Sequence, residues 1–265
     1  MLKKVASGEK VALVTVIGKE GSAPRDIGAT MAIASDGSKV GTIGGGELEG
    51  ILIKEAMSTL AENRPKRLKI ALRPENVPED AIKTGMICGG VVEVFINIVS
   101  PERRLVVVGA GHVGKPVADI GNILGYKVIV IDKNPDLLSP QRYPYAERIL
   151  GDVVEEVGKL ELNETDVVVI AYGEPEVDYQ VLKKLILKNF KGHIWALCSK
   201  RRAKWMLDRL KQENIDLRDF EGRIHAPAGL DIGSDTPEEI AVSIWAEIIC
   251  EVKKCSKPVK PLGIF

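Results

Sequence analysis

Residues 109–114, Gly-Ala-Gly-His-Val-Gly, have the composition of a phosphate-binding turn. The turn follows the apolar run Leu-Val-Val-Val and precedes a helical pattern, as a dinucleotide-binding fingerprint requires. In such a turn Gly109 bends the chain, Gly111 lets a pyrophosphate approach the backbone, and Gly114 lets the helix pack closely on the strand. Free amides at the helix start would bind the phosphates of NAD or NADP.

Two side chains complete this predicted nucleotide site. Asp132 follows the next apolar run, at the spacing where an acidic residue accepts hydrogen bonds from the adenosine ribose and favours NAD over NADP. His112 lies inside the turn and is the one histidine for which we expect a function. The alternative is that the turn only closes a sheet and binds no nucleotide.

A second glycine-rich loop, at 18–28, lies in the first hundred residues. It contains Ser22, Pro24 and Arg25, and the guanidinium of Arg25 is suited to bind an anion through two hydrogen bonds. The need for positive φ in turns is the competing explanation for each glycine here.

A third loop, at 41–49, contains Gly44, Gly45 and Gly46 immediately before a predicted helix start. Three residues without side chains would expose backbone donors there. Glu47 and Glu49 follow and would repel a bare phosphate, so we expect a ligand that also has polar, pterin-like or amide edges.

The fourth cluster, at 85–90, places Cys88 directly before Gly89 and Gly90. A thiolate on such an accessible backbone can be stabilised by amide groups and can bind a soft metal or a sulfur species. The alternative is a small buried hydrophobic residue, as most free cysteines are. We assign that structural role to the other three cysteines, Cys198, Cys250 and Cys255.

The elements that position these residues differ between the two halves of the chain. From residue 102 onward, β-branched runs at 105–108, 128–131, 167–170 and 193–197 alternate with helical patterns. This alternation predicts an α/β fold with a doubly wound, Rossmann-like parallel sheet, buried on both faces. The first hundred residues instead predict a smaller α/β domain with a hairpin at Asp36-Gly37.

The segment Ser-Pro-Glu-Arg-Arg at 100–104 separates two apolar runs and is the candidate domain boundary. We therefore predict an N-terminal domain over 1–100, a nucleotide-binding domain over 101–253 and a tail over 254–265. A terminal helix is predicted from Thr236, whose hydroxyl and the carboxylate of Glu239 have capping-box spacing.

The composition excludes several classes of partner. Lysine and arginine total 37, as do aspartate and glutamate, so there is no overall charge to attract nucleic acid or an anionic membrane. Four cysteines in a chain this long indicate a reducing compartment. Because no run approaches the roughly 20 apolar residues of a membrane span, we expect a cytoplasmic protein. The basic run at 200–211 is either a solvated helix face or, in its first turn, faces an anion.

Four stretches together resemble the XdhC/CoxI family, the xanthine dehydrogenase accessory factors. They are residues 20–50, 85–95, 106–134 and 226–249, in the order in which the family has them. The resemblance implies a small N-terminal domain followed by a Rossmann domain, in a homodimer. It also implies binding of the molybdenum cofactor (molybdopterin), sulfuration with a cysteine desulfurase, and delivery to a molybdenum hydroxylase as a chaperone.

By position, Cys88 matches the cysteine of the family's Cys-Gly-Gly motif, which implies a role in holding the cofactor and its metal. The loops around Ser22 and Pro24 and around Gly44 to Gly46 match the other N-terminal signature. The chain departs from the family at Glu47, where many members have cysteine, and in the segments 171–178 and 196–202.

An NAD(P)-dependent oxidoreductase is the main alternative. It would use Gly109, Gly111, Gly114 and Asp132, but the sequence shows no acid/base constellation beyond Tyr172 and Asp178. A third hypothesis is a scaffold that senses a nucleotide without turnover.

Overall fold

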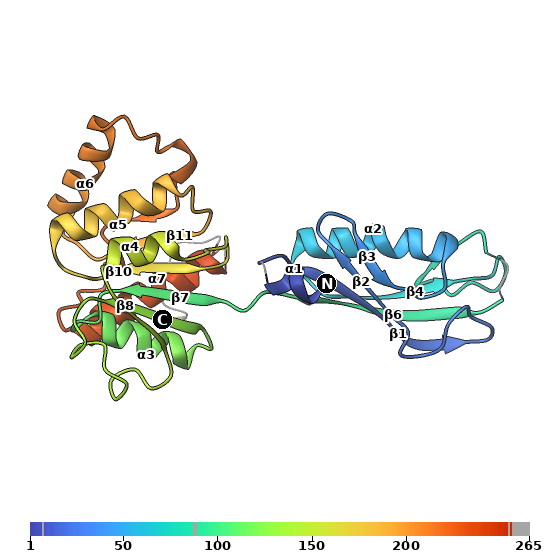
Figure 1. The fold of residues 1–265 in the computed structure, drawn as a ribbon. Coiled ribbons are helices and arrows are strands. Elements are labelled where there is room, and N and C mark those ends of the chain that lie inside the picture. The colour runs from blue at the N-terminus through green and yellow to red at the C-terminus, as the bar shows by residue number, and fades with distance from the viewer. Residues whose placement is uncertain (7, 87–88, 254, 256–265) are drawn as a thin grey trace, which may run out of the picture. The chain divides into compact units, whose positions relative to one another are not determined.

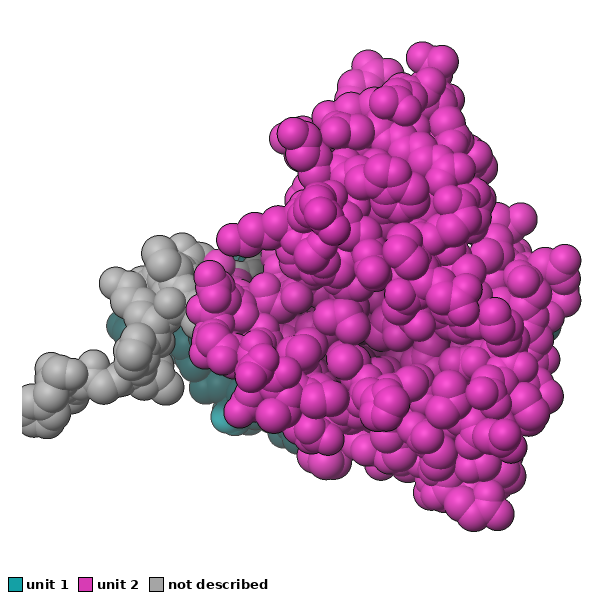
Figure 2. Space-filling view, turned by 90° about the vertical axis from the view of Figure 1, so that its left-hand side faces the viewer, with its two compact units in different colours: residues 1–102 teal, residues 103–265 magenta. Residues whose placement is uncertain are grey.

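The computed structural model of the chain describes residues 1–6, 8–86, 89–253 and 255. The chain divides into two compact units, unit 1 over Met1–Glu102 and unit 2 over Arg103–Phe265, coloured separately in Figure 2. The division falls inside the polar segment 100–104. Among the described residues, no helix combines the length and the apolar character needed to cross a membrane.

Unit 1 is a mixed sheet covered by one long helix, α2, which lies along the sheet in Figure 1. The strand order is β3-β2-β1-β6-β4-β5, and all neighbours are antiparallel except β4 and β5. Its described elements are α1 (Leu2–Ala6), β1 (Val11–Glu20), β2 (Thr30–Ala34), β3 (Lys39–Gly41), α2 (Gly46–Glu62), β4 (Lys66–Ala71), β5 (Ala81–Lys83) and β6 (Val91–Val99). β2 and β3 form the hairpin predicted from Asp36-Gly37.

The core of unit 1 forms on the helix-facing side of the sheet. Side chains alternate between the two faces of a strand, and in β1 the buried set is Ala12, Val14 and Val16. These pack in one cluster with Leu48 and Leu52 of α2. The pairing of β1 with β6 shifts register between Val16 and Gly18 and then continues to Glu20, directly before the loop at 21–28.

Unit 2 is the doubly wound parallel sheet that the sequence predicted, in the order β12-β11-β10-β7-β8-β9. Its described elements are β7 (Arg104–Val108), α3 (Gly114–Ile123), β8 (Lys127–Asp132), β9 (Glu147–Leu150), α4 (Val153–Lys159), β10 (Val167–Ile170), α5 (Pro175–Leu187), β11 (His193–Ala196), α6 (Lys200–Gln212), the short 3-10 turn η1 (Arg218–Phe220), β12 (Ile224–His225) and α7 (Pro237–Val252). From β7 the sheet extends on one side through β8 and β9, and on the other side through β10, β11 and β12. The switch point of the sheet therefore lies between β7 and β10.

Each face of this sheet has its own core. Val106 and Val108 of β7 belong to the cluster that contains α4, α5 and α6, whereas Leu105 and Val107 belong to the cluster with α3 and α7. Burial on both faces explains why the strands are continuous apolar runs. The capping box predicted for α7 is present, because the Glu239 amide donates to Thr236 Oγ1 at 3.2 Å and the Thr236 amide donates to Glu239 Oε2 at 3.0 Å.

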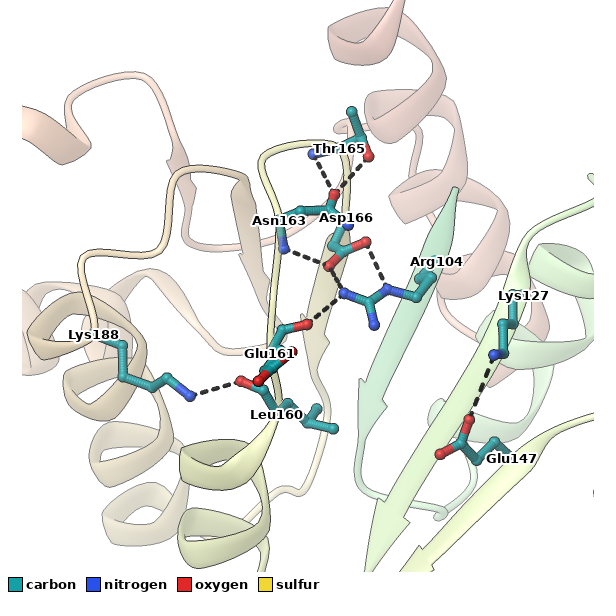
Figure 3. Close-up of polar contacts among 9 residues, drawn as sticks. All are labelled: Arg104, Lys127, Glu147, Leu160, Glu161, Asn163, Thr165, Asp166 and Lys188. Atoms are coloured by element: carbon teal, nitrogen blue, oxygen red, sulfur yellow. Dashed lines mark hydrogen bonds and ion pairs between the residues drawn. The ribbon is translucent and has the colours of Figure 1, made fainter. Parts of the chain in front are cut away.

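The amino-terminal end of the unit 2 sheet is held by a buried carboxylate, Asp166 (Figure 3). Its side chain is fully buried and accepts from Arg104 Nε at 3.0 Å and from the Asn163 amide at 2.8 Å. Arg104 also donates to the carbonyl of Glu161 at 2.6 Å. The loop before β10 is thereby fixed to the first residue of β7.

We expect Asp166→Asn to lower the stability of unit 2 by about 2–4 kcal/mol, because it removes the charged acceptor that compensates Arg104. Trp195, Trp205 and Trp245 are the only tryptophans and all lie in unit 2, so denaturant unfolding followed by tryptophan fluorescence reports on this unit. Glu147→Gln is the control, because its pair with Lys127 spans 3.9 Å between exposed side chains and contributes at most about 0.5 kcal/mol. Equal midpoints for the two variants would contradict this assignment.

Candidate functional site

The glycine loops of unit 1 converge, although they are far apart in the sequence. A Cβ added to Gly90 would lie 2.2 Å from the carbonyl oxygen of Ser22 and 2.6 Å from that of Glu20. Gly21 has a φ of +70°, and a Cβ there would lie 3.2 Å from the carbonyl oxygen of Gly89. The backbone at Gly90 therefore lies so close to the backbone at 20–22 that there is no room for a side chain at Gly90.

The loop at 41–46 joins the same cluster. Gly44 has a φ of +133°, and a Cβ there would lie 2.5 Å from the Cβ of Pro24. The amide of Gly85 donates to both carboxylate oxygens of Glu47, each at 3.0 Å. We call the three loops, 21–28, 41–46 and 85–90, the glycine cluster.

The buried carboxylate of Glu49 fixes the conformation of the loop at 41–46 through hydrogen bonds to its backbone. It accepts hydrogen bonds from the amides of Ile43 at 3.3 Å and Gly45 at 3.0 Å, and from the Thr42 hydroxyl and the Lys39 ammonium. The side chain of Lys39, followed by that of Thr42, lowers the pKa of Glu49 to about 2. Glu49 is therefore a charged anchor for the loop and does not face a ligand.

The hydrogen bonds within the loop at 41–46 occupy two of the three backbone amides that were expected to be free for a ligand. The amide of Gly45 donates to Glu49 and that of Gly44 to the Thr42 hydroxyl at 3.3 Å, so neither is available to a ligand. Gly46 begins α2, whose N-terminus has no side-chain cap. The carboxylate of Glu47 accepts from the Gly85 amide, and its expected repulsion of a bare phosphate stays a prediction.

Other predicted residues of unit 1 lie at the surface of the cluster. Ser22, Arg25 and Gly89 are exposed, whereas Gly90 is buried. Within the described part of the chain, Arg25 has neither an ion pair nor a hydrogen bond through its guanidinium, while its neighbour Asp26 pairs with Lys19. Cys88 lies outside the described residues, so its predicted contact with a metal stays a prediction. The described residues contain no group of three or more side chains placed to hold a metal ion.

In unit 2, the glycine turn at 109–114 lies at the switch point of the sheet. Gly109 has a φ of +109°, and a Cβ there would lie 2.6 Å from the carbonyl oxygen of Ala171, at the end of β10. A Cβ on Gly114 would lie 1.9 Å from the carbonyl oxygen of Gly109, whereas one on Gly111 would meet nothing within 4 Å. Gly109 thus forms the predicted tight turn and Gly114 the predicted close packing. The backbone at Gly111 is open, as an approaching ligand would require.

Asp132 has a structural task that the sequence did not reveal. Its carboxylate is 3% exposed and accepts from the Ala110 amide at 2.7 Å and from the Asn134 amide at 2.8 Å. Both oxygens thus hold the backbone of the turn and of the following loop. The predicted contact with a ribose stays a prediction, and His112 is exposed beside the turn.

A polar pair lies on the other side of the switch point; the sequence had indicated Asp178 as a possible acid/base group, but not its partner Arg202. Asp178 in α5 is buried and accepts from the Gly173 amide at 3.3 Å, while its Oδ2 lies 3.5 Å from Nη1 of Arg202 in α6. Burial raises the pKa of Asp178 to about 6 and that of the nearby Cys198 to about 11. The segments 171–178 and 196–202 therefore meet at this edge, and the sequence signal for this proximity was that both segments follow strands.

The fold and the glycine-rich sites define the class of protein: a small α/β domain followed by a Rossmann domain. A family model described as the XdhC Rossmann domain matches residues 105–248, and one described as the XdhC and CoxI family matches residues 5–71. The chain belongs to the XdhC and CoxI family.

Two relatives extend the comparison. The uncharacterized protein YqeB of Escherichia coli K12 is 34% identical over 263 residues, which are 95% of this chain and 46% of YqeB. A protein of Bacillus subtilis described as a probable xanthine dehydrogenase component is 30% identical over 156 residues, which are 58% of this chain and 44% of that protein. The chain thus spans less than half the length of these relatives.

A crystal structure described as a xanthine dehydrogenase from Bacillus halodurans has the same fold. It superposes with a TM-score of 0.53 at 22% sequence identity, and the match covers 96% of this chain and 94% of that one.

We expect Glu49→Gln to destabilise unit 1 by about 1.5–3 kcal/mol, because several donors lose a charged acceptor. The pKa of Glu49 is depressed, so its contribution is complete above about pH 4.5 and is lost as the pH falls towards 2. Hydrogen exchange of residues 41–60, corrected for intrinsic rates, should show this pH dependence in the wild type and not in Glu49→Gln. Glu62→Gln, which changes an exposed carboxylate on the same helix, is the control.

We expect Gly114→Ala to destabilise unit 2 by about 1–3 kcal/mol or more through the clash with Gly109, and Gly111→Ala to change its stability by less than about 0.5 kcal/mol. Tryptophan fluorescence during denaturant unfolding measures both. Equal destabilisation by the two variants would show that the turn does not have this packing.

Proposed function

We propose that this protein is a cytoplasmic accessory protein that binds the molybdenum cofactor, supports its sulfuration and delivers it to a xanthine dehydrogenase-type molybdenum hydroxylase. Membership of the XdhC and CoxI family supports this proposal. The observation that carries it is the glycine cluster, in which three loops meet around the chain neighbours of Cys88.

The residues of the cluster suit the chemistry of that cargo. Molybdopterin has an anionic phosphate and a flat pterin edge with several hydrogen-bonding groups. The exposed guanidinium of Arg25 would pair with the phosphate, and the uncapped N-terminus of α2 would supply amide donors. Side-chain-free backbone at Gly46 and Gly89 allows the pterin edge to approach.

Cys88 would supply the soft ligand. A cysteine thiolate binds soft metal centres and sulfur species more readily than oxygen ligands do. Gly89, the next residue in the sequence, is exposed. We therefore assign the contact with molybdenum to Cys88, and we expect a cysteine desulfurase and the client hydroxylase as partners of a homodimer.

We expect Cys88→Ser to lower cofactor retention by at least about tenfold, because it removes the soft ligand while preserving size. The test incubates the full chain with molybdenum cofactor under anaerobic conditions, removes unbound cofactor, and measures molybdenum by elemental analysis and pterin by fluorescence after oxidation. Cys198→Ser is the matched control, because the pKa of that thiol is raised to about 11 by burial, and it should retain the cofactor as the wild type does. Equal retention in all three proteins would remove Cys88 from the site.

An NAD(P)-dependent oxidoreductase is the second candidate, favoured by one specific observation. The open space over Gly111 lies at the switch point of a Rossmann sheet, where dinucleotides bind in this architecture. Titration with NAD and NADP tests this candidate: Gly111→Ala, which we expect to keep the fold, should weaken nucleotide binding only if a nucleotide approaches the backbone at Gly111.

A further inference from the structure

The last helix ends in a motif that brings two cysteines together. Helix α7 has Lys253 as its C-terminal cap, and the amide of Cys255 donates to the carbonyl oxygen of Cys250 at 2.9 Å. Counted from the cap, Cys250 is the third-last helical residue and Cys255 is the second residue after the cap. This hydrogen bond has the spacing of the long bond of a Schellman motif, and side chains at two positions spaced in this way commonly contact each other.

The environment of the two thiols agrees with that geometry. The side chain of Cys255 is the largest cause of a raised pKa of Cys250, ahead of burial. Cys255 is exposed and Cys250 is partly exposed, and neither forms a disulfide in the structure. The backbone hydrogen bond and this side-chain interaction indicate that the two thiols lie close to each other, and a reagent from solvent can reach Cys255.

The third described cysteine has a different environment. Cys198 follows β11 and packs against the apolar cluster of α4, α5 and α6, where burial raises the pKa of its thiol to about 11. A thiol held protonated in this way reacts slowly, because the thiolate is the nucleophile. Cys198 thus provides an internal reference for reactivity.

We propose that Cys250 and Cys255 form a redox-active dithiol, which a low-molecular-weight disulfide oxidises to an intramolecular disulfide. In the first step the Cys255 thiolate attacks one sulfur of the reagent, forms a mixed disulfide and releases one thiolate. In the second step Cys250 loses its proton and attacks the Cys255 sulfur, and the second thiolate leaves. In sum, two protein thiols and one small disulfide give one protein disulfide and two small thiols.

Because Cys250 and Cys255 are only five positions apart, the disulfide between them can be formed and reduced reversibly. A disulfide between residues five positions apart closes a small loop and restricts the unfolded chain less than a long loop would. An exposed disulfide with little stabilising effect is readily reduced again by thiols. The proposal does not depend on binding of the molybdenum cofactor.

The test uses the reduced full chain and glutathione disulfide as the probe, followed by alkylation and mass spectrometry. Trypsin cleaves after Lys253, so a Cys250–Cys255 disulfide joins two separate tryptic peptides. We expect the wild type to yield this joined peptide, about 2 Da lighter than the sum of its two reduced peptides, and added thiols should restore the two separate peptides. Cys198→Ser should behave as the wild type does.

The single variants separate a dithiol from two independent thiols. Cys250→Ser and Cys255→Ser should each stop at a glutathione adduct on the remaining cysteine, and neither should form the joined peptide. Independent adducts on both cysteines of the wild type, or no reaction at either, would overturn the proposal. Circular dichroism of each variant verifies that α7 and the rest of the fold are retained.

Discussion

The close approach of backbone to backbone at a few glycines is the constraint on which both candidate sites depend. In unit 1 the chain at Gly90 passes so near Ser22 that a methyl group would overlap a carbonyl oxygen, and in unit 2 Gly114 is equally near Gly109. No rotamer change relieves such a clash, because both partners are main chain. The loops can be assembled only with glycine at these positions.

Buried or engaged carboxylates then fix the loops that the glycines allow. Glu49 holds the amides of Ile43 and Gly45, Asp132 holds that of Ala110, and Asp178 holds that of Gly173. Each carboxylate occupies donors that an anion would otherwise use. The remaining anion-binding capacity of unit 1 therefore lies in the start of α2 and in Arg25, which explains why the proposal assigns the cofactor phosphate to them.

The two units support different parts of the function that we propose. Unit 1 contains the residues suited to the molybdenum cofactor, and unit 2 has the sheet architecture of a nucleotide-binding domain. The segments 171–178 and 196–202 meet at the switch point through Asp178 and Arg202. A ligand at that edge would thus meet a buried carboxylate paired with a guanidinium.

The sequence by itself determined the fold class of unit 2, the packing of the glycines in the turn at 109–114, and the capping of α7. These features depend on local spacing or on strands buried along their whole length, and both leave a direct signal in the order of residues. The edge strands β9 and β12 were not predicted, because short and largely exposed strands have no apolar run. Only the tertiary structure decided that Glu49 and Asp132 would be buried anchors, that Asp178 would face Arg202, and that three separate glycine loops would form one cluster. The physical reason is that the residue type alone does not show whether a carboxylate is solvated or hydrogen-bonded to a backbone amide. Its partner depends on which segments the fold brings next to it.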